Sequence, residues 1–143
     1  LVDSPLNTPD EDGFAGNMVP GAPMDDAPVT GGKTAWLLGD MDTRFHLLHY
    51  VEDAGALSAQ QAQALAGLAD HPIAVHAIVV AQRGTAPAGL ATLIDAQGAL
   101  RERYDLQPGT SYLLRPDQHV AARWRQLDAA KVRAAVNRAT GNV

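Results

Sequence analysis

The sequence predicts an α/β sandwich, in which helices flank a central mixed β-sheet, preceded by an irregular N-terminal arm. Two observations support this prediction. A helix with clear start and stop signals lies between apolar segments, which is typical of a β-α-β crossover. Near the C-terminus, two short apolar segments are followed by a final helix, and this ββα unit indicates antiparallel strands added to the same sheet.

Length and composition narrow the class of protein. The chain has 143 residues, of which 46% are hydrophobic and 19% charged, so it suits one domain with a sizeable core. The absence of cysteine excludes a disulfide scaffold, thiol redox catalysis and a thiolate metal site. A net charge of −5 gives no general reason to expect nucleic acid as a partner.

No segment of the sequence has the pattern of a membrane span or a signal peptide. The longest apolar stretch, residues 73–81, is far shorter than the ~20 residues that a spanning helix needs. We therefore expect a cytoplasmic protein without a membrane partner. Abundant alanine and an excess of arginine over lysine favour a bacterial origin.

Residues 1–33 are expected to form a linker, or a strap that lies on another surface. They hold five of the nine prolines and five of the thirteen glycines, and they show neither helical nor strand periodicity. The ordered domain is expected to span residues 34–143. Because the chain begins with leucine, we expect it to be processed or cut from a longer protein.

Charge is divided unevenly along the chain. Residues 1–72 carry 11 acidic residues against Lys33 and Arg44, whereas residues 73–143 carry 5 acidic residues against 9 basic ones. The asymmetry has two interpretations: an acidic arm lies against a basic surface or a partner, or the two halves have ordinary solvated faces.

The first half of the domain reads as a hairpin, a helix and a buried strand. Residues 34–38 and 44–50 are predicted strands joined by a turn. The capping-box spacing from Ser58 starts an amphipathic helix that ends before Pro72. The continuous β-branched run at 73–80 is typical of a strand covered on both faces.

The second half adds a short strand, a short helix, a hairpin and a closing helix. Asp128 caps the last helix, which runs through Arg138. The other predicted elements are a strand at 91–94, a helix at 99–106 and hairpin strands at 111–114 and 119–124. This order of elements is the thioredoxin-like arrangement.

The chemical motifs are weak. Ala27 to Thr34 fits a permissive Walker A pattern, but a proline-rich segment precedes it and no long helix follows. The i, i+3 spacing of His46 and His49 sends them to opposite faces of a strand, and His76 is expected in the core. Three or four converging ligands, as zinc requires, are not indicated.

Serine and carboxylate patterns also fail to indicate catalysis. Ser58 is already used as a helix cap, and neither it nor Ser111 lies in a nucleophile elbow. Asp95 and Asp117 fall in turns, where aspartate is favoured for structural reasons. The remaining candidates are too scattered for a paired acid and base or for a stacking platform: Glu102, Asp105, Trp36, Trp124, Tyr104 and Tyr112.

One long segment carries a family resemblance. The run from Tyr104 to Trp124, above all Tyr-Leu-Leu-Arg-Pro-Asp at 112–117, resembles the C-terminal domain of FAD-dependent aromatic hydroxylases related to phenol hydroxylase and 3-(3-hydroxyphenyl)propionate hydroxylase. Residues 20–29 look like the proline-rich leading segment of that domain, although its usual arginine is missing. Residues 36–38 and 45–48 look like its first hairpin.

The resemblance implies a thioredoxin-like fold without thioredoxin chemistry. Thr110 stands where the active-site cis-proline of thioredoxin would be, and the redox cysteines are absent. The dinucleotide-binding and substrate motifs of these hydroxylases lie in preceding domains. No catalytic, cofactor-binding or metal residue can therefore be assigned in this chain.

The resemblance implies that the chain is a non-catalytic C-terminal domain of a larger monooxygenase. That parent would use FAD, NAD(P)H and O2, and this domain would contact the preceding FAD and substrate domains or form a homodimer. The alternative is a free-standing thioredoxin-like module that binds a small molecule or a protein. An independent enzyme has only the Walker-like segment and the scattered histidines in its favour.

Overall fold

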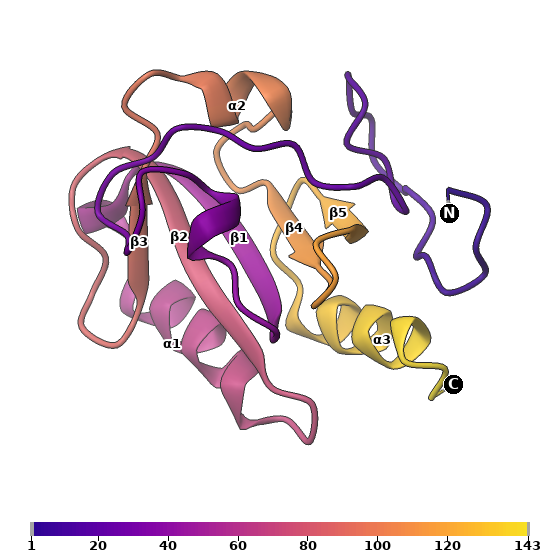
Figure 1. The fold of residues 1–143 in the computed structure, drawn as a ribbon. Coiled ribbons are helices and arrows are strands. Elements are labelled where there is room, and N and C mark those ends of the chain that lie inside the picture. Colours follow the sequence, from indigo (N-terminus) through magenta and orange to yellow (C-terminus); the bar gives the residue numbers. More distant parts are fainter. Residues whose placement is uncertain (1, 143) are drawn as a thin grey trace.

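The computed structural model describes residues 2–142 and contains one five-stranded mixed sheet. The strand order is β3-β2-β1-β4-β5, with the first three strands parallel and the last two antiparallel to their neighbours (Figure 1). The predicted thioredoxin-like α/β sandwich is thus confirmed. The strands are β1 (Phe45–Asp53), β2 (Val75–Arg83), β3 (Ala91–Ile94), β4 (Ser111–Leu114) and β5 (Val120–Trp124).

Among residues 2–142, three α-helices accompany the sheet, and the first and the last of them begin at the predicted capping residues. Ser58 forms the predicted capping box with Gln61 at the start of α1. The Asp128 carboxylate accepts hydrogen bonds from the first backbone N–H groups of α3. The helices are α1 (Ala59–Gly67), α2 (Ala99–Arg103) and α3 (Ala129–Ala139), and 3-10 turns occur at η1 (Leu38–Asp40), η2 (Ala54–Ala56) and η3 (Leu68–Asp70).

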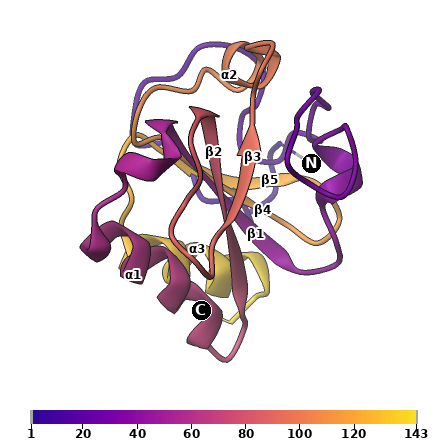
Figure 2. The same cartoon turned by 90° about the vertical axis from the view of Figure 1, so that its left-hand side faces the viewer.

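One face of the sheet, here called the helical face, is covered by α1 and α3. Leu65 of α1 and Val132 of α3 are fully buried against Leu47 of β1 and Val79 of β2. Figure 2 shows both helices on the same side of the sheet. The β-α-β crossover and the closing helix therefore share one hydrophobic core.

The opposite face, here called the strap face, is covered by α2 and by the N-terminal strap, residues 2–33. Apolar strap side chains are buried there against Tyr50 of β1 and Val80 of β2. Leu100 and Tyr104 from α2 and its C-terminal end complete the cover. The buried strap side chains are Met18, Ala22, Met24, Ala27 and Val29.

The strap crosses the sheet and pairs with both of its edges (Figure 1). Gly21 N donates to Val120 O at 2.7 Å and Val120 N donates to Ala22 O at 2.9 Å, at the β5 edge. At the β3 edge, Thr30 and Ile94 exchange two backbone hydrogen bonds of 3.0 and 2.9 Å. Both open edges are thus partly covered, which removes sites for unwanted strand pairing.

The predicted strand at 34–38 is wrong. The Thr34 hydroxyl bonds the backbone N–H and carbonyl of Trp36, and Asp40 accepts a hydrogen bond from Thr34 N, so the segment folds into a local turn. β1 could not have paired with it, because β2 and β4 occupy its two sides. The boundary at residue 33 stays a prediction, although five apolar side chains between residues 18 and 29 belong to the core.

The other predicted elements shift only at their ends. The helix predicted from Ser58 closes at Gly67 and continues as the turn η3, and α2 ends at Arg103 rather than at residue 106. The predicted buried strand is β2, which extends to Arg83. Within residues 2–142, no helix is long and apolar enough to cross a membrane.

Candidate functional site

The structure does not build a phosphate site from the Walker-like segment at 27–34. Pro28 bridges to Trp36 and Thr30 to Ile94, so the segment continues the path of the strap. The turn that follows, η1, has three residues. A phosphate cradle needs the N-terminus of a proper helix directly after its glycines, and this segment has none behind it.

The histidines on β1 point to opposite faces, as predicted. His46 lies on the strap face, where its ring contacts that of His76 at 5.6 Å between centroids and its Nε2 lies 3.3 Å from Asp42. His49 lies on the helical face and shares a hydrogen bond of 2.9 Å with Ser111. Among residues 2–142, no three histidine or carboxylate side chains gather so as to hold a metal ion.

The turn carboxylates have structural partners. Asp95 is fully buried and accepts hydrogen bonds from Leu100 N and Arg101 N at the start of α2, as well as from the Gln82 amide. Asp117 pairs with Arg115 in the turn between β4 and β5. These contacts hold the two loops in place, so the structure gives both carboxylates a structural role.

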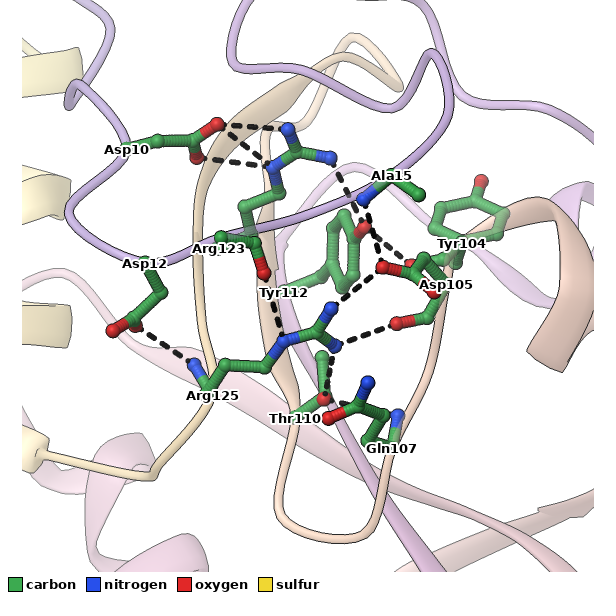
Figure 3. A network of polar contacts seen from close by, with 11 residues as sticks. Asp10, Asp12, Ala15, Tyr104, Asp105, Gln107, Thr110, Tyr112, Arg123 and Arg125 are labelled. Carbon is green, nitrogen blue, oxygen red and sulfur yellow. Dashed lines mark hydrogen bonds and ion pairs between the residues drawn. The ribbon is translucent and has the colours of Figure 1, made fainter.

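The best-organised polar cluster joins the strap to β5 (Figure 3). We call it the strap clamp, and its charged members are Asp10, Asp12, Asp105, Arg123 and Arg125. Arg123 on β5 donates from Nη2 to Asp10 Oδ2 at 2.7 Å and from Nε to Asp10 Oδ1 at 3.0 Å. Only 3% of the Arg123 side chain is exposed. A nearly buried guanidinium with a two-point carboxylate partner is a geometrically specific contact.

Arg125, just after β5, forms the second half of the clamp. Its guanidinium donates to the carboxylate and to the backbone carbonyl of Asp105, both at 2.6 Å. Its backbone N–H donates to Asp12 in the strap at 3.0 Å. Asp105 also accepts a hydrogen bond from Ala15 N at 2.8 Å, so one carboxylate joins the strap, the end of α2 and β5.

Phe14 of the strap contacts both arginines through its ring. The guanidinium carbons of Arg123 and Arg125 stand 4.4 and 3.8 Å from the centre of its ring. Tyr112 contacts the same ring edge-to-face at 5.9 Å. Cation-π and aromatic contacts of this kind each add roughly 0.5–1.5 kcal/mol.

Two buried tyrosines extend the contact toward the middle of the strap. Tyr112 OH donates to Tyr104 O at 2.6 Å, and Tyr104 OH donates to Asp25 O at 2.6 Å. Burial raises the pKa of both phenols above the ordinary value, so both stay protonated donors. The tyrosine chain thus ties β4 to α2 and α2 to the strap.

The electrostatics of the clamp favour a structural contact over a catalytic role. The hydrogen bond from Ala15 N and the contact with Arg125 lower the pKa of the Asp105 carboxyl, so it stays ionised. Glu11 pairs with Lys131 on α3, which adds a third acidic residue of the strap to the set. The charged groups of the clamp are matched by opposite charges or backbone donors, which suits a static contact.

Sequence reasoning missed the clamp, although its signal was present. The charge asymmetry gave two interpretations, and the structure agrees with the first: the acidic run at 10–12 lies against Arg123, Arg125 and Lys131. Pairing partners some 113 residues apart leave no local pattern, so only the net charges of the two halves could point to them.

The clamp also includes the residue just before β4. Thr110, which directly precedes β4, is fully buried and its hydroxyl accepts hydrogen bonds from Arg125 Nη1 at 3.0 Å and Gln107 N at 3.1 Å. Thr110, the residue predicted to stand in place of the active-site proline, is therefore a buried member of the clamp.

Comparisons with known proteins agree with this fold. The model of the HcaD C-terminal domain matches residues 29–139, which is most of the chain. The chain belongs to the HcaD C-terminal domain family. No curated protein sequence matches it.

The domain resembles parts of much larger flavoproteins. It superposes on the flavin-dependent monooxygenase PieE with a TM-score of 0.70 and 21% identity, covering 99% of this chain and 25% of PieE. For aklavinone-11 hydroxylase the TM-score is 0.65 and the identity 23%, covering 95% of this chain and 25% of the hydroxylase. The chain thus spans about a quarter of these proteins and matches their C-terminal portions, which confirms the predicted resemblance.

Whole thioredoxin-like proteins match as well. A mutant of peroxiredoxin Q from Xylella fastidiosa gives a TM-score of 0.61 at 12% identity, and the match covers 90% of this chain and 98% of the peroxiredoxin. At such low identity the likeness shows the fold alone.

Proposed function

We propose that this chain is the C-terminal domain of a larger bacterial, cytoplasmic FAD-dependent monooxygenase, which hydroxylates an aromatic substrate with NAD(P)H and O2. The domain itself is non-catalytic and braces the preceding FAD and substrate domains or a second subunit. The similarity to the C-terminal quarters of PieE and aklavinone-11 hydroxylase supports the place of the domain in such an enzyme.

The strap clamp is the observation that supports a bracing role. In a redox-active thioredoxin fold, the loop before β4 faces a reactive cysteine, but here Thr110 bonds to Arg125 and the chain has no cysteine. Salt bridges and aromatic contacts at the same edge hold the strap in place. The arrangement supports rigidity at the position where the fold usually carries chemistry.

The residues of this chain do not fit a flavin. The sequence has no glycine-rich dinucleotide loop between a strand and a helix, and the Gly31-Gly32-Lys33 segment follows the bridge to the β3 edge without a helix behind it. FAD and NAD(P)H would therefore bind to other domains of the parent protein.

A free-standing binding module remains the second candidate, because the thioredoxin-like match to peroxiredoxin Q spans nearly all of that protein. An immunoblot of source-cell lysate with an antibody against this chain separates the two. A band several times larger than 15.1 kDa is expected for a domain of a monooxygenase, whereas a band at that size would favour the module.

Flavin binding and NADPH oxidation provide a second test of the proposal. The purified chain is expected to show no flavin absorbance after mixing with FAD and desalting, and no oxidation of NADPH. The full-length parent, purified in the same way, should retain flavin absorbance after desalting and should oxidise NADPH. Flavin bound by the isolated chain would contradict the non-catalytic assignment.

A further inference from the structure

A cavity of about 350 Å³ opens on the helical face, between α3 and the segment that joins α1 to β2. Its volume lies near the lower end of the ~300–1,000 Å³ that is typical of ligand pockets. None of the charged members of the strap clamp lines it. The cavity therefore has room for a compact molecule and is separate from the contacts of the clamp.

Aliphatic side chains from both sides form the floor of this cavity. Leu68, Val75, Val132 and Val136 line it and belong to the hydrophobic core, so the floor is the outer surface of the core itself. Ile73, just before β2, also lines the cavity and is only partly buried. A hydrocarbon body that covered these side chains would remove apolar area from water, which contributes about 25 cal/mol per Å².

The rim of the cavity is polar and carries one permanent charge. Arg133 of α3 lines the cavity and is exposed, so its stem follows the wall and its guanidinium meets solvent at the mouth. Within residues 2–142, this guanidinium has no hydrogen bond or ion pair. Asn137 and Asn142 add amide groups to the same lining, and none of the lining residues is acidic.

The other charged groups of α3 already have partners. Lys131 pairs with Glu11 of the strap, and Arg138 donates to a strap carbonyl at 2.9 Å. The Asp128 carboxylate accepts hydrogen bonds from the backbone at the start of the helix and does not line the cavity. Arg133 is therefore the group of this helix whose charge a ligand in the cavity would meet without a partner.

The charge of the rim selects the head group of the ligand. An anion would pair with Arg133, whereas a cation would meet a like charge and no carboxylate in the lining. The planar guanidinium matches the two oxygens of a carboxylate, and one arginine balances one negative charge. A phosphate dianion would keep a second charge unpaired. A carboxylate on an aliphatic body thus matches both the rim and the floor.

We infer that this cavity is a binding site for a medium-chain aliphatic carboxylate, whose head group pairs with Arg133 and whose hydrocarbon chain lies on the aliphatic floor between α3 and the start of β2. The inference goes beyond the proposed monooxygenase role and does not depend on it, because the site uses neither the strap nor a flavin. Failure of the experiment below would leave that role untouched.

Backbone amide NMR of the whole chain tests the inference with three monomeric probes that share one alkyl chain. Octanoate should shift the amide signals of Ile73, Val132, Arg133 and Asn137. Octan-1-ol lacks the charge and should bind roughly fivefold more weakly, which corresponds to one exposed ion pair of about 1 kcal/mol. Octylammonium carries the charge of Arg133 itself and should bind most weakly.

A matched pair of arginine variants locates the ion pair. Arg133→Gln should abolish the preference for octanoate over octan-1-ol and leave the affinity for octan-1-ol unchanged. Arg101→Gln removes an exposed arginine of α2, outside this cavity, and should preserve the preference. In the unmodified protein, added salt should reduce the preference, because it screens an exposed ion pair.

A second pair of variants tests the cavity without altering its arginine. Asn137→Phe places a ring in the lining and should weaken octanoate and octan-1-ol alike, while Ala134→Phe, at an exposed position of α3 outside the lining, should not. Equal affinity for octanoate and octan-1-ol, tightest binding of octylammonium, or an unchanged preference in Arg133→Gln would each overturn the inference. So would shifts that are absent from the lining or spread evenly over the surface.

Discussion

The two faces of this sheet are closed by different means. On the helical face, α1 and α3 satisfy their own backbone hydrogen bonds and only need to present apolar side chains. On the strap face, residues 18–29 bury five apolar side chains without forming a regular element. An irregular chain must find partners elsewhere for its backbone and its charges.

The strap finds those partners at the edges of the sheet. Its backbone pairs with Val120 at one edge and Ile94 at the other, and its acidic run binds Arg123 and Arg125. An irregular segment can thus close a core if both of its ends are anchored. Three perturbations should show how far the two faces depend on these different supports.

The largest effect is expected from removing the strap. Deletion of residues 1–33 uncovers the strap face, including Tyr50 and Val80, and the remaining chain should lose its cooperative thermal unfolding. Circular dichroism during heating measures this. Deletion of residues 1–4 serves as the control and should leave the transition in place. A shortened chain that still unfolds cooperatively would instead support the predicted domain boundary at residue 33.

An intermediate effect on stability is expected from a substitution in the strap clamp. Arg123→Ala leaves Asp10 and the Tyr112 hydroxyl without their buried partner and should lower the free energy of unfolding by about 2–4 kcal/mol. The matched change Arg44→Ala breaks the exposed pair with Asp42 and should cost at most about 1 kcal/mol. Urea unfolding compares the two, and similar losses would mean that the clamp adds no more than a surface ion pair.

The smallest effect is expected in the pH dependence of stability, which should differ between His49 on the helical face and His46 on the strap face. The pKa of His49 is about 4 in the folded chain because of burial, whereas the unfolded chain binds the proton near pH 6.5. Neutral His49 therefore makes its full contribution to the free energy of unfolding above about pH 6.5. As the pH falls toward 4, the free energy of unfolding decreases by at most about 3 kcal/mol.

His46 provides the comparison for that pH dependence. Burial lowers its pKa too, but the neighbouring Asp42 carboxylate opposes the shift. Urea unfolding between pH 7 and 4 should show a much flatter slope for His49→Phe and a smaller change for His46→Phe. An unchanged slope in His49→Phe would show that this imidazole does not remain neutral in the fold.

The sequence by itself determined where α1 and α3 begin and which segment forms the buried strand β2. Ser58 and Asp128 mark helix starts through contacts within three residues, and the β-branched run at 73–80 encodes a buried strand locally. Such signals can be read because the interacting groups are neighbours in the chain. The resemblance at 104–124 added the family, and the structure and the family match agree with it.

Only the tertiary structure decided the rest. The segment at 34–38 has the composition of a strand, but β1 had no free side to pair with it. The contacts of Asp10 with Arg123 and of His49 with Ser111 join residues 113 and 62 positions apart. Their energies depend on which side chains the fold brings together and buries, and no spacing along the chain encodes that.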